Sequence, residues 1–165
     1  PYAASKRSGE LIAHTYHHLY GIEATGLRYF TVYGPRQRPE MAIHKFTRMI
    51  EAGESIPVFG DGSSRRDYTY VDDIIDGTLA AIERGHGYRI YNLGESRTTT
   101  LLELVRMIGE ALGKTPQVGH LPEQPGDVPA TWADVTRARV ELGYDPGIGV
   151  EEGLERFVAW YRQAG

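Results

Sequence analysis

The sequence predicts a domain of the α/β class, because helical and strand-like segments alternate along its 165 residues. Apolar side chains recur at helical spacing in some segments, and short apolar or β-branched runs lie between them. Glycine and proline close several of these runs. A chain of this length can bury one sizeable hydrophobic core.

The chain opens with a predicted helix over 3–19, which ends at Gly21. The apolar side of this helix carries Leu11, Ile12, Thr15, Tyr16 and Leu19. A strand is predicted over 24–29, and the Tyr-Gly-Pro sequence that follows at 33–35 breaks it.

The middle of the chain continues the alternation. A helix over 43–52 stops at a glycine, and a short apolar strand over 56–59 is closed by a Gly-Asp-Gly turn. A strand over 67–71 leads into a helix over 72–84, and another strand is predicted over 88–93.

The last third begins with a predicted helix over 100–112, in which Thr100 and Glu103 have the spacing of a capping box. Val118 is expected in a short strand, and a Pro-rich loop follows over 121–129. Two final helices are predicted near 134–142 and 150–162.

The composition excludes several classes of protein. The formal net charge of −4 gives no reason to expect a nucleic acid as partner. Without cysteine, disulfides and thiolate chemistry are excluded. No apolar run has the length of a membrane span, so we expect no membrane partner, no signal peptide and a cytoplasmic location. The chain starts inside a helical pattern without an initiator methionine, which we interpret as part of a longer protein.

Tyr2 and Lys6 are the first candidate catalytic residues. They lie four residues apart, so they share one helix face, and a nearby ammonium favours the phenolate form of a tyrosine. Such a tyrosine can serve as a general acid or base. The small residues between them leave room for a flat cofactor. The alternative is a chance pairing at the start of a surface helix.

A dinucleotide-binding α/β enzyme should place G-x-G-x-x-G between a strand and a helix. The nearest match, over 60–65, lacks the third glycine and leads toward another strand, so we interpret it as a turn. If the protein uses a dinucleotide, most of that binding site lies outside this chain.

Three segments carry groups suited to an anion or a sugar. Over 26–39 a strand runs into a turn with two arginines, which offer the donor fork that carboxylates and phosphates prefer. Arg65 and Arg66 beside a Gly/Ser turn form a plausible phosphate clamp. The loop with Gln124 and Asp127 is either a surface connection or a lid that hydrogen-bonds a sugar or ribose.

Two other groups are better explained structurally. Asp72 and Asp73 fall at a helix start, where carboxylates satisfy free N–H groups, so we do not assign them to catalysis or metal binding. Three histidines of the first predicted helix have helical spacing, which could suggest a metal site. No acidic or cysteine ligands lie nearby, so we expect exposed helix residues: His14, His17 and His18.

Four segments, in this order, are similar to a known family: PYAASKRSGE, LRYFTVYGPRQRPEMA, PVFGDGSSRRDYTYVDDI and QPGDVPATWAD. On them the whole chain resembles the C-terminal half of the extended short-chain dehydrogenase/reductase family, and specifically its nucleotide-sugar epimerases. The resemblance implies half of an NAD(P)-binding Rossmann-type fold with a substrate-binding subdomain. Residues 1–35 would end the Rossmann domain, and 36–165 would form mainly the subdomain, interleaved with the last Rossmann elements.

The resemblance also implies roles for single residues. Tyr2 would be the catalytic base, Lys6 would hold the nicotinamide ribose of NAD, and Tyr29 would lie against the nicotinamide. Phe59 would line the uracil site and Arg66 would hold the diphosphate. The two loop residues would contact the nucleotide: Gln124 and Asp127.

Thr31 and Arg38 make the UDP-glucuronate 4-epimerase branch the best match, ahead of UDP-glucose 4-epimerase. UDP-glucose epimerases usually have asparagine at the position of Thr31 and commonly arginine at that of Gln124. The implied partners are a UDP-sugar substrate and a second copy of the chain in a homodimer. The residue that separates NAD from NADP is not in this chain, and the chain alone is expected to be inactive.

Other interpretations stay open. One is a nucleotide-sugar dehydratase or decarboxylase of the same family, whose additional acid and base groups would lie upstream. Another is a non-catalytic module that binds a sugar nucleotide, and a third is a purely structural α/β domain.

Overall fold

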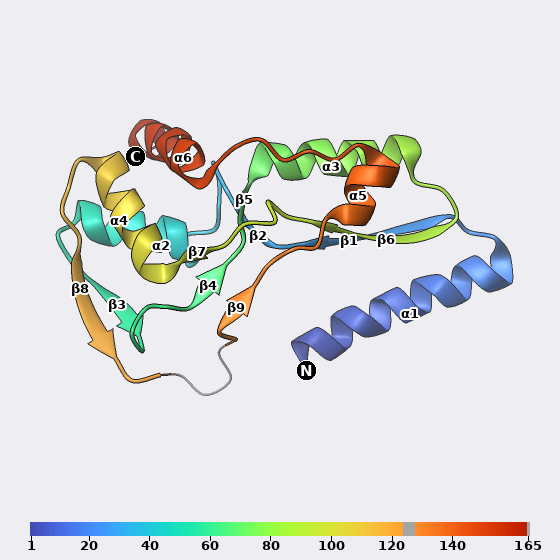
Figure 1. Ribbon diagram of the computed structural model, residues 1–165, viewed down its shortest axis with the longest axis horizontal. Helices are drawn as coiled ribbons and strands as arrows, with labels where there is room; N and C mark the ends of the chain where they lie inside the picture. The colour runs from blue at the N-terminus through green and yellow to red at the C-terminus, as the bar shows by residue number, and fades with distance from the viewer. Residues whose placement is uncertain (124–127, 165) are drawn as a thin grey trace.

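The computed structural model describes residues 1–123 and 128–164, and its alternating helices and strands confirm the α/β prediction (Figure 1). The helices are α1 (Tyr2–Tyr20), α2 (Ala42–Glu51), α3 (Val71–Arg84), α4 (Leu101–Leu112), α5 (Thr136–Leu142) and α6 (Val150–Ala164). The strands are β1 (Ala24–Tyr29), β2 (Thr31–Tyr33), β3 (Ser55–Phe59), β4 (Arg65–Arg66), β5 (Tyr68–Tyr70), β6 (Tyr88–Leu93), β7 (Thr99–Thr100), β8 (Gln117–Leu121) and β9 (Ala130–Thr131).

The longer elements form where the sequence predicts them. β1 and β6 have the predicted bounds, and α1 ends at Gly21, which adopts the left-handed conformation. The capping box at the start of α4 is also confirmed: the Thr100 hydroxyl accepts from the Glu103 amide at 3.2 Å, and the Glu103 carboxylate accepts from the Thr100 amide at 2.8 Å.

The predicted strand over 67–71 is wrong in its bounds. Asp67 separates the short strands β4 and β5, and Val71 already belongs to α3. The expected capping role of the two aspartates is also wrong. Asp72 is exposed, with its carboxylate 3.5 Å from the Arg156 guanidinium, whereas Asp73 accepts from the amides of residues 147 and 148 at 3.1 Å each. Asp73 therefore anchors the connection between α5 and α6 rather than its own helix end.

The central feature of the fold is a strand that changes partners. β1 pairs in parallel with β6, from Ala24 opposite Tyr88 to Tyr29 opposite Leu93. After one residue, Phe30, the same chain segment continues as β2 and pairs in parallel with β5. β4 pairs with β7 on one side and β9 on the other, and β3 pairs with β8.

The helices divide into two groups around these strands. In Figure 1, α1 and α3 lie on opposite sides of the β1–β6 pair, while α2 and α4 gather beside β3 at the other end of the molecule. One hydrophobic cluster joins α2, α4 and α6 to β3 and β5, and the other joins α3 and α5 to β6. α1 contributes no buried residue to either cluster. The predicted domain boundary at residue 35 stays a prediction.

Asp67, between β4 and β5, is completely buried. Its Oδ1 accepts hydrogen bonds from the Thr69 hydroxyl and the Glu95 amide, and its Oδ2 accepts from the Ser96 and Ala133 amides, all at 2.9 Å. A buried carboxylate is tolerated when its oxygens are satisfied in this way.

The backbone of Asp67 joins further segments to this point of the fold, which we call the Asp67 junction. Its amide donates to the Thr131 carbonyl at 3.0 Å, and its carbonyl accepts from the Thr31 amide at 3.1 Å. Only a glycine fits at Gly94, because an added Cβ would lie 2.9 Å from Asp67 Oδ2 and 2.5 Å from Ala133 Cβ. The segments around residues 31, 67, 95 and 132 therefore meet at one point.

Glu95 brings a second carboxyl group to this junction. Glu95 is 7% exposed, and its Oε1 lies 3.8 Å from the Arg97 guanidinium. Its Oε2 has no hydrogen-bond partner among the described residues. Burial raises the pKa of the Glu95 carboxyl to about 7, and the nearby Asp67 carboxylate acts in the same direction.

We expect Asp67→Asn to lower the free energy of unfolding by about 3 kcal/mol or more, because the new side-chain NH2 group would face N–H donors that the carboxylate now accepts from. Urea titration of the protein measures this loss. Asp61→Asn is the matched control, since Asp61 is exposed and accepts from the Ser63 amide in a turn, and it should change stability little. Equal effects of the two substitutions would contradict the assigned role of Asp67.

We expect Glu95→Gln to flatten the dependence of stability on pH. The carboxyl ionises near pH 4.3 in an unfolded chain and at about 7 in the folded protein. As the pH rises between these values the unfolded state ionises first, so the wild-type free energy of unfolding should fall by up to about 4 kcal/mol.

Unfolding titrations at several pH values between these limits test the effect of Glu95→Gln. Glu103→Gln is the control, because hydrogen bonds from Thr100 lower the pKa of Glu103, so its contribution should be lost toward acid pH instead. The same slope in wild type and Glu95→Gln would show that Glu95 does not cause the effect.

Candidate functional site

α1 presents the predicted catalytic pair at its first turn. The Lys6 ammonium lies 5.3 Å from the centroid of the Tyr2 ring, so the positive charge faces the aromatic system. Tyr2 is 75% exposed, and the residues between the pair are exposed as well. Tyr2, Lys6 and Glu10 follow one another at intervals of four and share one face of α1.

An open hollow of about 780 Å³ lies at the carboxyl end of β1. It brings together three residues that the sequence singled out, Tyr29, Thr31 and Arg38. The rest of its lining is Arg28, Phe30, Val32, Gln37, Met41, Asn92 and Thr131. Ligands of α/β proteins bind outside the carboxyl ends of strands, and this volume accommodates a hexose. We call this the strand-end hollow.

The two arginines of the strand-end hollow are held differently. Arg28 donates from Nε and Nη2 to the two carboxylate oxygens of Glu10, at 2.6 and 2.8 Å. The Arg38 side chain is 75% exposed, and its guanidinium lies 3.4 Å from the exposed Glu40 carboxylate. Because exposed ion pairs are weak and exchange readily, Arg38 is the arginine that can turn to an incoming anion.

The loop that carries Arg38 is held by Gln37. The Gln37 side chain donates from Nε2 to the Val32 carbonyl at 3.1 Å, and its Oε1 accepts from the His44 backbone amide at 3.3 Å. The His44 ring nitrogen Nδ1 lies 2.8 Å from the Gln37 carbonyl oxygen. Arg36 in this loop adopts a positive φ of 63°, which is uncommon for a residue with a side chain. The start of α2 therefore sets the place of the loop.

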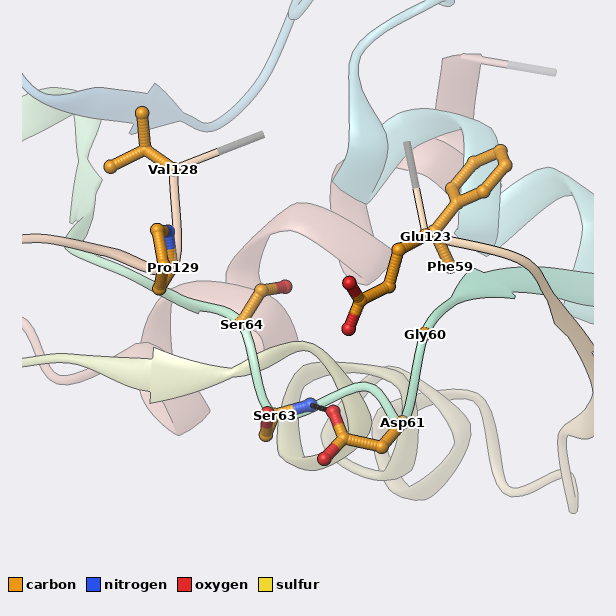
Figure 2. Close-up of a pocket in the computed structure, with 8 residues that line it drawn as sticks. All are labelled: Phe59, Gly60, Asp61, Ser63, Ser64, Glu123, Val128 and Pro129. Atoms are coloured by element: carbon orange, nitrogen blue, oxygen red, sulfur yellow. Dashed lines mark hydrogen bonds between the residues drawn. The ribbon is translucent and has the colours of Figure 1, made fainter. Parts of the chain in front are cut away.

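A second, smaller hollow of about 180 Å³ lies where β3 ends and β9 begins (Figure 2). Its lining is Phe59, Gly60, Asp61, Ser63, Ser64, Glu123, Val128 and Pro129. In Figure 2 the Glu123 carboxylate and the Ser64 hydroxyl point toward one another across it, and the Asp61 carboxylate accepts from the Ser63 amide at 2.9 Å. We call this the turn hollow.

The segment over 60–65 is a turn between strands, as the sequence predicts. Gly62 has a φ of 77°, and an added Cβ there would lie 2.5 Å from the Leu102 side chain. Since the turn leads into β4 and not into a helix, it does not offer the helix N-terminus of a dinucleotide-binding loop.

Arg66 lies between the two hollows. Its partners in register are Thr99 and Thr131, and Thr131 lines the strand-end hollow. Ser64, two residues earlier, lines the turn hollow. Arg66 Nη1 donates to the Arg65 carbonyl at 2.8 Å.

Of the other residues that the sequence singled out, two are described by the structure and two are not. The Tyr29 hydroxyl lies 3.1 Å from the Thr78 hydroxyl of α3, and Phe59 stands at the rim of the turn hollow. Gln124 and Asp127 fall outside the described residues. The roles assigned to all of these residues stay predictions.

The prediction that the three histidines of α1 are exposed is wrong for His17. His17 is half-buried, and its ring stacks at 6.3 Å from that of Tyr88, which His14 also meets edge-on at 4.9 Å. These two rings therefore hold α1 against β6. Within 1–123 and 128–164, no group of three histidine or carboxylate side chains is arranged to hold a metal ion.

Within the same ranges, no helix combines the length and the apolarity that crossing a bilayer requires.

Sequence reasoning missed Asn92, Gln37 and Glu10. Asn92 lies one residue before the end of β6, the strand beside β1, so the rule that ligands lie at the carboxyl ends of parallel strands would have found it. Glu10 continues the Tyr2–Lys6 spacing by one more turn of helix, which is a visible signal. Gln37 depends on the position of His44, and no local pattern predicts that contact.

Comparison with known proteins gives a family for this arrangement. The model of the NAD dependent epimerase/dehydratase family matches residues 1–94. UDP-glucuronate 4-epimerase of Thermodesulfobacterium geofontis is 42% identical over 164 residues, which are 99% of this chain and 50% of the relative. The chain thus spans about half the length of the curated relatives it matches.

Three solved structures have the same fold. UDP-glucose 4-epimerase of Thermotoga maritima, with UDP-glucose, superimposes with a TM-score of 0.94 at 36% identity over 99% of this chain and 54% of that one. UDP-glucuronic acid 4-epimerase of Bacillus cereus, with UDP-glucuronic acid and NAD, gives 0.93 at 38% identity over 100% and 53%. The dTDP-glucose 4,6-dehydratase DesIV of Streptomyces venezuelae gives 0.92 at 33% identity over 99% and 51%.

Proposed function

Because the chain belongs to the NAD dependent epimerase/dehydratase family, we propose that it forms the sugar-nucleotide half of an epimerase that interconverts UDP-glucuronate and UDP-galacturonate. The observation that carries this proposal is the position of Arg66, which comes two residues after Ser64 of the turn hollow and lies in register with Thr131 of the strand-end hollow. The family alone does not choose the substrate, since epimerases and a dehydratase are similarly close to the chain.

The proposed order of binding follows the two hollows. The uracil ring packs against Phe59 at the rim of the turn hollow, and the diphosphate lies beside Arg66. The sugar then reaches the strand-end hollow, which is large enough for it. We also assign contacts with the nucleotide to the two residues outside the described ranges, Gln124 and Asp127.

The choice of glucuronate rests on Thr31 and Arg38. The Thr31 hydroxyl can donate to a carboxylate, and the weakly held Arg38 guanidinium can form a charge-assisted pair with it. Arg28 is the poorer candidate for this purpose, because its Nε and Nη2 already donate to Glu10 and fix its guanidinium. A neutral hydroxymethyl group would gain much less from Arg38.

Tyr2 and Lys6 carry the proton transfer in this proposal. The Tyr2 oxygen takes the proton of the sugar 4-hydroxyl and returns it after the 4-keto sugar has rotated in the site. The Lys6 ammonium near the ring stabilises the negative charge that the phenolate bears. The chemistry that bound NAD supplies is the removal of hydride from C4 and its return to the opposite face.

The described residues fit one end of NAD. The exposed small side chains after Tyr2 leave the first turn of α1 open to a flat ring, and we assign the ribose to Lys6. Tyr29 is the proposed contact of the nicotinamide. The turn over 60–65 does not fit the pyrophosphate, so we propose that the catalytically complete protein has further residues for it.

The outer side of α1 favours a homodimer. Ile12, Tyr16 and Leu19 recur at helical spacing on the side away from Glu10 and are 58%, 52% and 62% exposed. Pairing with the same helix of a second copy would cover them. A cytoplasmic location remains part of this proposal.

A second candidate is a nucleotide-sugar 4,6-dehydratase, which the similarity to DesIV favours. It would use the same oxidation at C4 but release water from the sugar. UDP-glucose 4-epimerase is the alternative with the same chemistry, and a non-catalytic module that binds UDP-sugars is the alternative without it.

We expect the complete protein, with the half that its relatives have before this region, to convert UDP-glucuronate to UDP-galacturonate when NAD is present. Chromatography of the UDP-sugars measures the product, and UDP-glucose is tested in parallel. The 165-residue chain alone should bind UDP without turnover. Conversion of UDP-glucose only would overturn the substrate, and a keto product with loss of water would favour the dehydratase.

We expect Arg38→Ala to raise KM for UDP-glucuronate about 10- to 100-fold, the value of one charge-assisted pair, and to leave KM for UDP-glucose nearly unchanged. Steady-state kinetics on both substrates measure the two effects. Arg106→Ala removes an exposed arginine paired with Glu110 on α4 and serves as the control. An unchanged KM for UDP-glucuronate would remove Arg38 from the site.

A further inference from the structure

α1 is held to the sheet by polar and aromatic contacts in place of a hydrophobic interface. None of its residues is buried, yet it carries Tyr2 and Lys6. The Tyr88 hydroxyl of β6 donates to the Glu10 carbonyl at 2.8 Å, and the Tyr88 ring packs against two histidines of α1. The bidentate pair between Glu10 and Arg28 holds the same part of α1, one helical turn from Lys6.

The Glu10–Arg28 pair is partly shielded from water. The Glu10 side chain is 16% exposed and that of Arg28 is 46% exposed, and Arg7 also contacts the Glu10 carboxylate. The hydrogen bonds from Arg28 lower the pKa of the Glu10 carboxyl to about 2. The pair is therefore ionised at every pH at which an enzyme of this kind would work.

Because α1 is a rigid helix, a small change of its tilt at Glu10 becomes a larger displacement of Tyr2. At 1.5 Å per residue, Tyr2 lies about 12 Å along the axis from Glu10. A tilt of about 10° at Glu10 would displace Tyr2 by about 2 Å, while misplacement of a reacting group by about 1 Å can cost about 100-fold in rate. The fixed orientation of two parallel N–H···O bonds opposes such a tilt.

Arg28 also belongs to the wall of the strand-end hollow. It lies in β1 opposite Asn92, three residues before Thr31, so its position is set by the sheet. The pair consequently connects the helix that carries the phenol to the strand that borders the proposed sugar site.

We propose that Glu10 and Arg28 are positioning residues, whose bidentate pair sets the place of the Tyr2 hydroxyl relative to the strand-end hollow. This inference rests on the proposed function for its kinetic consequence. The competing role for Arg28 is direct contact with a substrate anion, which the two bonds to Glu10 disfavour.

The test uses the complete protein with Glu10→Gln and Arg28→Lys, which keep the size or the charge of each side chain but break the bidentate pair. We expect kcat to fall about 10- to 100-fold while the Kd for UDP changes by less than about twofold, because the turn hollow belongs to other elements. The double variant should be no slower than the worse single variant.

Glu110→Gln on α4 is the matched control, because Glu110 forms an exposed pair with Arg106 and should leave both kcat and Kd unchanged. A rise in KM with kcat unchanged would show that Arg28 touches the substrate and would overturn the positioning role. Parallel losses of kcat, UDP binding and thermal stability would show a merely structural pair and would overturn it too.

Hydrogen exchange separates this inference from the proposed function. Glu10→Gln should speed amide exchange in α1, between residues 3 and 9, and leave exchange in α4 unchanged. If the wild-type protein proves to have no epimerase activity, the proposed function fails while this expectation still stands. Unchanged exchange in α1 together with unchanged kcat would overturn the inference.

Discussion

Asp67 is fully buried between β4 and β5, and its four side-chain hydrogen bonds join segments that are far apart in the sequence. Its backbone bonds add the start of β2 and the end of β9. A buried carboxylate is stable only when such donors surround it, so the four segments must meet in one arrangement. Both candidate hollows border these segments. The hydrogen bonds of one aspartate therefore join segments next to both hollows.

The change of partner at Phe30 follows from the same junction. β1 pairs with β6 up to residue 29, and β2 then pairs with β5, whose first residue comes directly after Asp67. A crevice forms where a parallel sheet changes its neighbour, because the strands on either side diverge. Thr31 and Arg38 reach this crevice from β2 and from the loop held by Gln37. Their place in the crevice thus follows from the topology, and residues of β2 pack against both hydrophobic clusters.

Charge is distributed unevenly across this arrangement. The carboxylates of Glu10 and Asp67 are saturated with donors, whereas Glu95 is buried with one oxygen unpartnered among the described residues. Arg28 is committed to α1, and Arg38 remains turned to solvent. One arginine therefore joins α1 to β1 and the other stays exposed, although both line the same hollow. A guanidinium can do either task, and the neighbouring carboxylate decides which.

The sequence by itself determined the α/β class, the bounds of β1 and β6, the capping box of α4 and the turn after β3, because each follows from local periodicity or from glycine chemistry. The family resemblance singled out Thr31 and Arg38, and the structure brings both into the lining of one hollow. The two- and three-residue strands β2, β4, β5, β7 and β9 are too short for a periodic signal. Only the tertiary structure decided their pairing, the hub at Asp67, the role of Asp73 and the Glu10–Arg28 pair, because these depend on donors and acceptors from distant segments meeting in space.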